Sequence, residues 1–270
     1  MAGDGKSSPA SHEGKRPSRI VEQSTEISHR IGSMNMKPII RHLSLALGLG
    51  LALAAFGQFA GVSLGLSASE AVARTKHPGK RLYMRKTCVA CHGRNGKRAI
   101  QDYPNVAGQE KSYLANQIMD IVNGKRTGGL NAQGKPRAEA MRGALVTPEG
   151  QPRITKEEAV RIADWLASLE PAKPNPPKDL KPEDIAAGEK LYKKKRCFTC
   201  HGKKGDKPLK GYPYIAGQKY EYIIHQIQDI RDKKRTNGKT KAMFNFVRKL
   251  TDDEIAKIAA WLSTIDRTAK

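Results

Sequence analysis

Two short stretches of the chain decide its fold: Cys88-Val89-Ala90-Cys91-His92 and Cys197-Phe198-Thr199-Cys200-His201. Two cysteines three residues apart, with a histidine directly after them, form the attachment sequence of c-type haem. The two sulfurs lie on one side of a helical turn, where both can bond to one porphyrin, and the histidine can ligate the iron. Because the two copies use all four cysteines of the chain, the sequence predicts two covalently attached haem c groups with His92 and His201 as iron ligands.

Other uses of a C-x-x-C pair fit the chain less well. Zinc ribbons separate their two pairs by about 15–20 residues, whereas 105 residues lie between Cys91 and Cys197. A redox dithiol needs a βαβ context, which the sequence does not indicate. Structural disulfides would leave the two histidines unexplained.

Composition and charge restrict the class of protein. The 270 residues suffice for two modest domains, but only 6% of them are aromatic, so buried porphyrins would supply much of the apolar volume of each core. The formal net charge is +23, nearly all of it beyond residue 73. Such an excess favours acidic proteins or anionic lipid as partners. We expect no nucleic-acid partner, since the haem motifs and the export signal described next place the protein elsewhere.

The N-terminal part has the pattern of an exported protein. Residues 1–35 are polar, and we expect them to form a disordered extension. Residues 36–73 read as a signal peptide or a membrane anchor: basic residues precede the uncharged run Leu43–Leu66, and an A-x-A cleavage site follows at 71–73. The run is long enough to span a membrane, but its glycines favour cleavage. The sequence thus predicts a periplasmic protein, either free or attached to the inner membrane.

The haem motifs belong to an internal repeat. Residues 79–127 match residues 188–236 without a gap at a constant offset of 109, and the last helices also agree. A repeat of this length is far above that of a solenoid and indicates a duplicated domain. We predict the first domain at 74–170 and the second at 183–270.

Each domain is predicted to be helical. A first helix leads into the haem motif, a second covers residues 111–123 or 219–233, and the last begins at Thr155 or Thr251, each an N-cap with acidic residues in the first turn. No strand alternation appears, so the fold class is all-α. Residues 171–182 contain five prolines and predict a semi-rigid linker.

A low-spin haem carrier needs a second axial ligand, and a duplicated domain should repeat it. Met141 and Met243 occupy matched positions between the second and the last helix, in what we expect to be loops. The other candidates align with residues of different types: Met84, Met119, His77 and His225. The repeat therefore predicts Met141 and Met243 as axial ligands, with core packing as the alternative. His/Met ligation raises the reduction potential of a haem relative to ligation by two histidines, and it leaves no open site for substrate.

Pro104 and Pro213 each follow their haem histidine by twelve residues. A proline carbonyl can accept the Nδ1 proton of the histidine and so fix the orientation of the ring. The alternative is an ordinary proline that sets a turn.

At this point the chain resembles a known group, the dihaem class I cytochromes c of the cytochrome c4 type. The resemblance covers about residues 78–266 and includes Tyr-Pro-x-x-Ala-Gly-Gln-x-x-Tyr and the Gln-x-x-Asp-Ile helix. It implies two tandem class I cytochrome c domains with methionine ligands. It also implies a crossing of the first and last helices at the Gly79/Tyr83 and Gly188/Tyr192 pairs. Unlike the second domain, the first contains the extra segment Val146–Pro152, so the two haem surroundings should differ.

The sequence therefore predicts an electron-transfer protein rather than an enzyme. The resemblance implies transfer of single electrons from donors such as a quinol–cytochrome c oxidoreductase to a terminal oxidase. Basic stretches at 193–196, 203–204 and 231–235 predict docking onto an acidic redox protein or a membrane oxidase. Two alternatives stay open: a membrane-anchored cytochrome subunit of a larger oxidoreductase complex, and a dihaem enzyme such as a peroxidase.

Overall fold

The structure, a computed structural model, describes residues 77–269, so the predictions for residues 1–35 and 36–73 lie outside the described residues. Within the described range all regular structure is helical, apart from two isolated β-bridges, and the all-α prediction is confirmed. None of the helices described is both long and apolar enough to cross a membrane. In chain order the helices are α2 (Pro78–Arg85), α3 (Cys88–His92), α4 (Lys111–Val122), α5 (Glu139–Leu145), α6 (Lys156–Ala167), α7 (Pro182–Lys194), α8 (Phe198–His201), α9 (Tyr220–Arg231), α10 (Thr240–Val247) and α11 (Asp252–Thr264).

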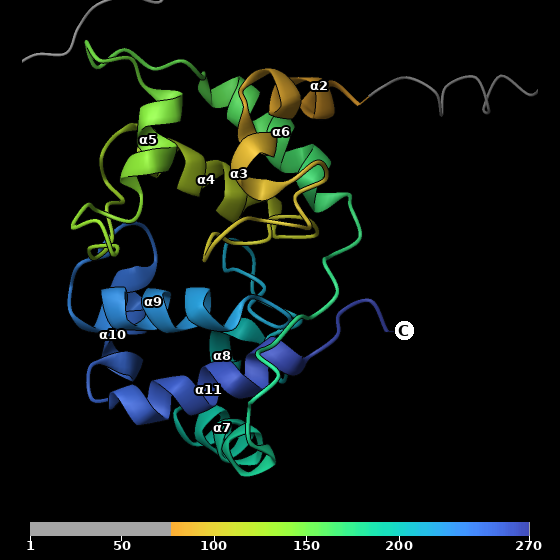
Figure 1. Ribbon diagram of the computed structural model, residues 1–270, viewed down its shortest axis with the longest axis vertical. Helices are drawn as coiled ribbons and strands as arrows, with labels where there is room; N and C mark the ends of the chain where they lie inside the picture. Colours follow the sequence, from red (N-terminus) through yellow and green to blue (C-terminus); the bar gives the residue numbers. More distant parts are fainter. Residues whose placement is uncertain (1–76, 270) are drawn as a thin grey trace, which may run out of the picture. The chain divides into compact units, whose positions relative to one another are not determined.

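The helices form two similar sets. In the first, α2 and α4 both pack against α6; in the second, α7 and α9 both pack against α11. Figure 1 shows the first set in orange to green and the second in teal to blue. Between the two sets, residues 171–181 contain no helix. Helix α7 begins at Pro182, and a proline is favourable there because the amide of the first helical residue has no hydrogen-bond partner within the helix. Each set has its own apolar core.

The last helix of each set begins where the sequence predicts. The hydroxyl of Thr155 accepts a hydrogen bond from the Glu158 amide, and the Glu158 carboxylate accepts one from the Thr155 amide. Thr251 and Glu254 form the same reciprocal pair at α11. These capping boxes satisfy amide groups that the first turn leaves free, and so they fix the start of each helix.

Glycines set the contact between the first and last helices of each set. A Cβ atom at Gly79 would lie 2.0 Å from the Arg161 carbonyl oxygen, and one at Gly188 would lie 1.9 Å from that of Lys257. The neighbouring tyrosines pack on tryptophans of the last helices, with ring centroids 5.0 Å apart for Tyr83–Trp165 and 4.8 Å apart for Tyr192–Trp261. The helix crossing implied by the resemblance is therefore present in both sets.

The same tyrosines fix the haem motifs to the helix crossings. The Tyr83 hydroxyl donates to the carbonyl of Gly93 (2.7 Å), and the Tyr192 hydroxyl donates to that of Gly202 (2.6 Å). Gly93 and Gly202 follow the motif histidines directly and adopt φ values of 75° and 81°, where glycine avoids the steric cost of a side chain. Each motif is therefore held at its C-terminal end by a buried side chain.

One local prediction is wrong. Met141 and Met243 lie on short helices, α5 and α10, rather than in loops. These helices are too short to show a reliable apolar period in the sequence. Leu145 and Val247, four residues after the methionines, are nevertheless both 3% exposed. Packing against the core therefore stabilises helices that would not form alone.

The two sets exchange matching hydrogen bonds. The Gln109 side chain donates to the Tyr214 carbonyl (2.8 Å) and accepts from the Tyr214 amide (2.6 Å). Gln218 makes the equivalent pair with Asn105, at 2.9 and 3.0 Å. Because the four residues occupy repeated positions, these contacts relate the two sets in the manner of a symmetric dimer interface.

A further contact between the sets is asymmetric. Asp229, only 3% exposed, accepts hydrogen bonds from Arg137 Nη1 (2.6 Å) and the Gly129 amide (3.0 Å). Its repeat counterpart, Asp120, accepts from the neutral side chain of Asn237 (2.7 Å). The first domain thus supplies a cation where the second supplies an amide.

Replacing Arg137 with methionine should lower the free energy of unfolding by about 2 kcal/mol, because it removes a charged donor from a buried carboxylate. Adding Asp229→Asn should recover most of the loss, since the charge is then gone as well. Denaturant unfolding of the holoprotein measures both. Additive losses in the double variant would contradict this account.

Candidate haem sites

The structure gathers most of the predicted site residues around one cavity; Cys91 and Cys200 do not line it. In the first domain Cys88, His92 and Met141 line it, and in the second Cys197, His201 and Met243 do so. An adjoining cavity reaches Cys200 and again contains His201 and Met243. The remaining lining is largely aliphatic and comes from the long helices, including Leu114, Ile118, Ile121, Ile162, Leu166, Ile223, Ile227, Ile230, Ile258 and Leu262. Such walls suit a large apolar ligand.

Each motif histidine has a fixed orientation. Nδ1 of His92 lies 2.9 Å from the Pro104 carbonyl oxygen, and Nδ1 of His201 lies 3.0 Å from that of Pro213. Burial lowers the pKa of both imidazoles and so favours their neutral form. A neutral ring that donates from Nδ1 keeps an unprotonated Nε2, the form in which histidine ligates a metal.

Two of the four cysteines have the pKa of buried thiols rather than of reactive ones. All four are free, and burial raises the pKa of Cys88 and of Cys197 to about 11. Reactive dithiols instead have a lowered thiol pKa. Among residues 77–269 there is also no group of three or more His, Cys, Asp or Glu side chains that could hold a metal ion. The raised pKa of Cys88 and of Cys197 is therefore unlike that of a reactive dithiol.

The backbone just before each motif is strained at the same repeated position. Thr87 and Arg196 adopt φ values of 59° and 58°, in the left-handed region that residues with side chains seldom occupy. Strain of this kind persists only where the surroundings enforce it, and it is concentrated at functional sites. This feature could not be predicted from the sequence, since neither residue is a glycine or an asparagine.

Two arginines near the cavity were missed as site residues. Arg126 donates to Gln117 (3.1 Å) and Tyr222 (2.9 Å), and Arg235, 6% exposed, donates to Gln117 (2.9 Å) and Gln226 (2.8 Å). All five side chains line the cavity. Within the described part of the chain neither arginine has a carboxylate within ion-pair distance. Arg126 and Arg235 occupy matched positions of the repeat, and this match was the sequence signal that could have identified them.

These observations fit a haem. Aliphatic walls match the apolar macrocycle, and each domain brings a neutral histidine, a thioether and a cysteine sulfur to the same cavity. The two arginines supply positive charge that no protein carboxylate balances locally. The acidic edge of a haem would require such a charge nearby.

The basic stretches predicted to dock a partner differ in how far their charges are available at the surface. Arg231 pairs with Asp232 and Asp252, each at 2.7 Å, and Arg235 is buried between the domains. The prediction that residues 231–235 provide docking charge is therefore wrong for both arginines, because two carboxylates pair with Arg231 and Arg235 is not at the surface. Lys203 and Lys204 are exposed.

Comparison with known proteins identifies the family. The cytochrome c family profile matches residues 77–170 and 185–266. Cytochrome c4 of Azotobacter vinelandii is 31% identical over 184 residues, which cover 65% of this chain and 82% of the relative. The thiosulfate dehydrogenase electron acceptor of Thiomonas intermedia is 28% identical over 193 residues, or 66% of this chain and 77% of the relative.

Among solved structures, reduced recombinant cytochrome c4 from Pseudomonas stutzeri matches with a TM-score of 0.56 and 27% identity, over 69% of this chain and 96% of that one. The fold, the repeated motif and these relatives agree on two covalently bound haem c groups in two tandem domains. The chain therefore belongs to the cytochrome c family and is a dihaem electron carrier of the cytochrome c4 type.

Proposed function

We propose that each haem is attached through one motif, to Cys88 and Cys91 in the first domain and to Cys197 and Cys200 in the second. His92 and Met141 would then be the axial ligands of one iron, and His201 and Met243 those of the other. The single observation that carries this assignment is that histidine and methionine of each domain line the same cavity, although 49 and 42 positions separate them in the sequence.

The protein residues would tune and hold the cofactor. Pro104 and Pro213 fix the histidine rings through their carbonyl oxygens and increase the basicity of the ligating nitrogens. A bound haem supplies the one-electron chemistry. A complete His/Met ligand set leaves no position for a substrate, which supports an electron carrier over a peroxidase.

The partners we propose are redox proteins of a respiratory chain, with a quinol–cytochrome c oxidoreductase as donor and a terminal oxidase as acceptor. The likeness to a protein named as the electron acceptor of thiosulfate dehydrogenase favours a thiosulfate dehydrogenase as a second candidate donor. We place the protein in the periplasm, where the signal-like stretch at 36–73 would direct it and where haem c is attached in bacteria. A role as a subunit of a larger complex has the same sequence support.

Haem counting tests the assignment. The pyridine haemochrome assay should give two haems per chain, and the Cys197→Ser/Cys200→Ser variant should give one. The matched Cys88→Ser/Cys91→Ser variant should also retain one, with the spectrum of the other domain. Two haems in either variant would contradict the attachment sites.

A further inference from the structure

Residues 99–104, the first haem loop, position the motif histidine of the first domain. The loop ends at Pro104, whose carbonyl oxygen lies 2.9 Å from Nδ1 of His92. Within it, Gln101 adopts a φ value of 46°, in the left-handed region that a side chain makes costly. The matching loop of the second domain has its positive φ at a glycine instead, Gly211. The first haem loop is therefore the strained one, and such strain persists only where neighbouring groups hold it.

The group that holds this loop comes from the second domain. Nζ of the half-buried Lys219 donates to the carbonyl of Ala99 and to that of Gln101, both at 2.6 Å. The loop has a further contact with α9, since Oδ2 of Asp102 lies 3.0 Å from Nδ1 of His225. Lys219 therefore ties the strained Gln101 to the residue two positions before it.

Lys219 is an unfavourable residue for its own helix. It is the N-cap of α9, where its side chain makes no cap hydrogen bond, and a cation at the positive end of a helix is destabilising. Its counterpart in the repeat, Glu110, has the suitable chemistry, because its carboxylate accepts a hydrogen bond from the Tyr113 amide at the start of α4 (2.5 Å). A residue that breaks a local rule in this way is expected to have another role.

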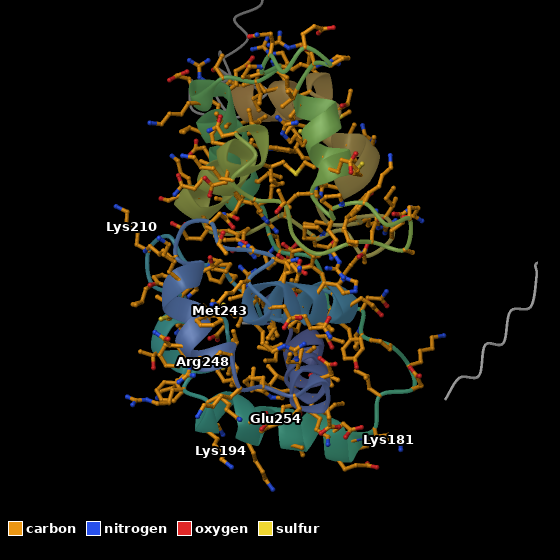
Figure 2. The ribbon with its side chains drawn as sticks, turned by 90° about the vertical axis from the view of Figure 1, so that its left-hand side faces the viewer. Lys181, Lys194, Lys210, Met243, Arg248 and Glu254 are labelled. Atoms are coloured by element: carbon orange, nitrogen blue, oxygen red, sulfur yellow. The ribbon has the colours of Figure 1, made fainter. Side chains whose placement is uncertain are left out.

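The second domain holds its own loop differently. Lys239, directly before α10, donates to the carbonyl of Lys210 in that loop (2.8 Å), and Figure 2 shows Lys210 and Met243 on the side of this domain that carries α10. In the first domain the residue that matches Lys239 is Arg137, which binds Asp229 instead. Each haem loop is thus held by a lysine of the second domain.

The charge of Lys219 also acts on the site of the first haem. Burial lowers the pKa of His92 despite its contact with Pro104, and the positive charges of Lys219 and Arg126 lower it further. The same charges that disfavour a proton on this ring would disfavour additional positive charge on an iron bound to it. Ferric iron carries one positive charge more than ferrous iron.

We infer that Lys219 is a positioning residue through which the second domain acts on the haem of the first. Its hydrogen bonds hold the loop that orients His92, and its charge favours the ferrous state and so raises the reduction potential of that haem. The inference rests on the proposed ligation of this haem by His92. Because the matching residue in the first domain is the carboxylate Glu110, two identical ligand sets acquire different potentials.

The test is a spectroscopic redox titration of the holoprotein at neutral pH. Met243→His serves as the background, because it lowers the potential of the second haem and leaves that of the first to be measured alone. Adding Lys219→Met should lower the ferrous-to-ferric ratio of the first haem at a fixed potential by at least about threefold, since a positive charge is lost near the iron. Lys219→Arg keeps both the charge and the donors, and it should restore most of this ratio.

Lys80→Met is the matched control in the same background. Lys80 is exposed on α2 of the first domain, and its loss changes the net charge by the same amount. Because solvent and salt screen an exposed charge, the ratio should stay nearly unchanged.

An equal fall in Lys219→Met and Lys80→Met would overturn the inference, because net charge alone would then set the potential. A Lys219→Met variant that lost stability in denaturant but kept the ratio would overturn it too, and Lys219 would then be a purely structural contact. Fewer than two haems per chain, or a wild-type protein without the methionine-to-iron absorption band, would instead contradict the proposed haem sites themselves.

Discussion

Met243→His should lower the reduction potential of one haem by on the order of 0.2 V, a fraction of the roughly 0.8 V that axial ligands span. The imidazole donates more strongly than the thioether and favours the ferric state. About half of the methionine-to-iron charge-transfer absorption should disappear as well. A spectroscopic redox titration of the holoprotein measures both changes. Met141→His should give the same result for the other haem.

The chain contains a matched control for these substitutions. Met84 lies on α2, is 43% exposed and is not among the residues that line the cavities described. Met84→His should leave both potentials and the absorption band unchanged. An unshifted potential in Met243→His would rule out Met243 as a ligand and return it to ordinary core packing.

Gly188→Ala should destabilise the second domain by about 3 kcal/mol or more. The added methyl group would overlap the Lys257 carbonyl and the Trp261 Cβ, at 1.9 and 3.0 Å. Since both are part of α11, α7 would have to separate from the helix that forms the core. Denaturant unfolding of the holoprotein gives the loss.

Gly143→Ala is the control for this substitution. Gly143 lies within α5, and a Cβ there has no atom within 4 Å. Alanine is the better helix former, so stability should stay the same or rise by up to about 1 kcal/mol. Comparable losses in both variants would show that the helix crossing is not the cause.

The duplication made much of the site predictable. Any ligand shared by the two domains has to occur at matched positions, and Met141/Met243 passed this criterion where Met84 and Met119 did not. The capping residues Thr155 and Thr251 could be read in the same way, because an N-cap acts within one turn and leaves a local signal.

Contacts between the domains could not be predicted in this way. Arg126 and Arg235 were equally visible in the repeat, and Arg235 was even assigned to a docking surface. Its burial between the domains follows from hydrogen bonds to Tyr113 and Gln117, 122 and 118 residues away. Sequence periodicity contains no information on partners at such a distance.

The sequence alone determined the cofactor and the all-α class, because haem attachment and helix capping depend on residues only a few positions apart. It also determined the duplication, because two stretches of the chain can be compared directly. Only the tertiary structure decided which arginines are buried, which helices carry the methionines and which lysine holds the first haem loop. Those properties depend on how distant segments pack together, and the same residue type has opposite roles at the surface and between two domains.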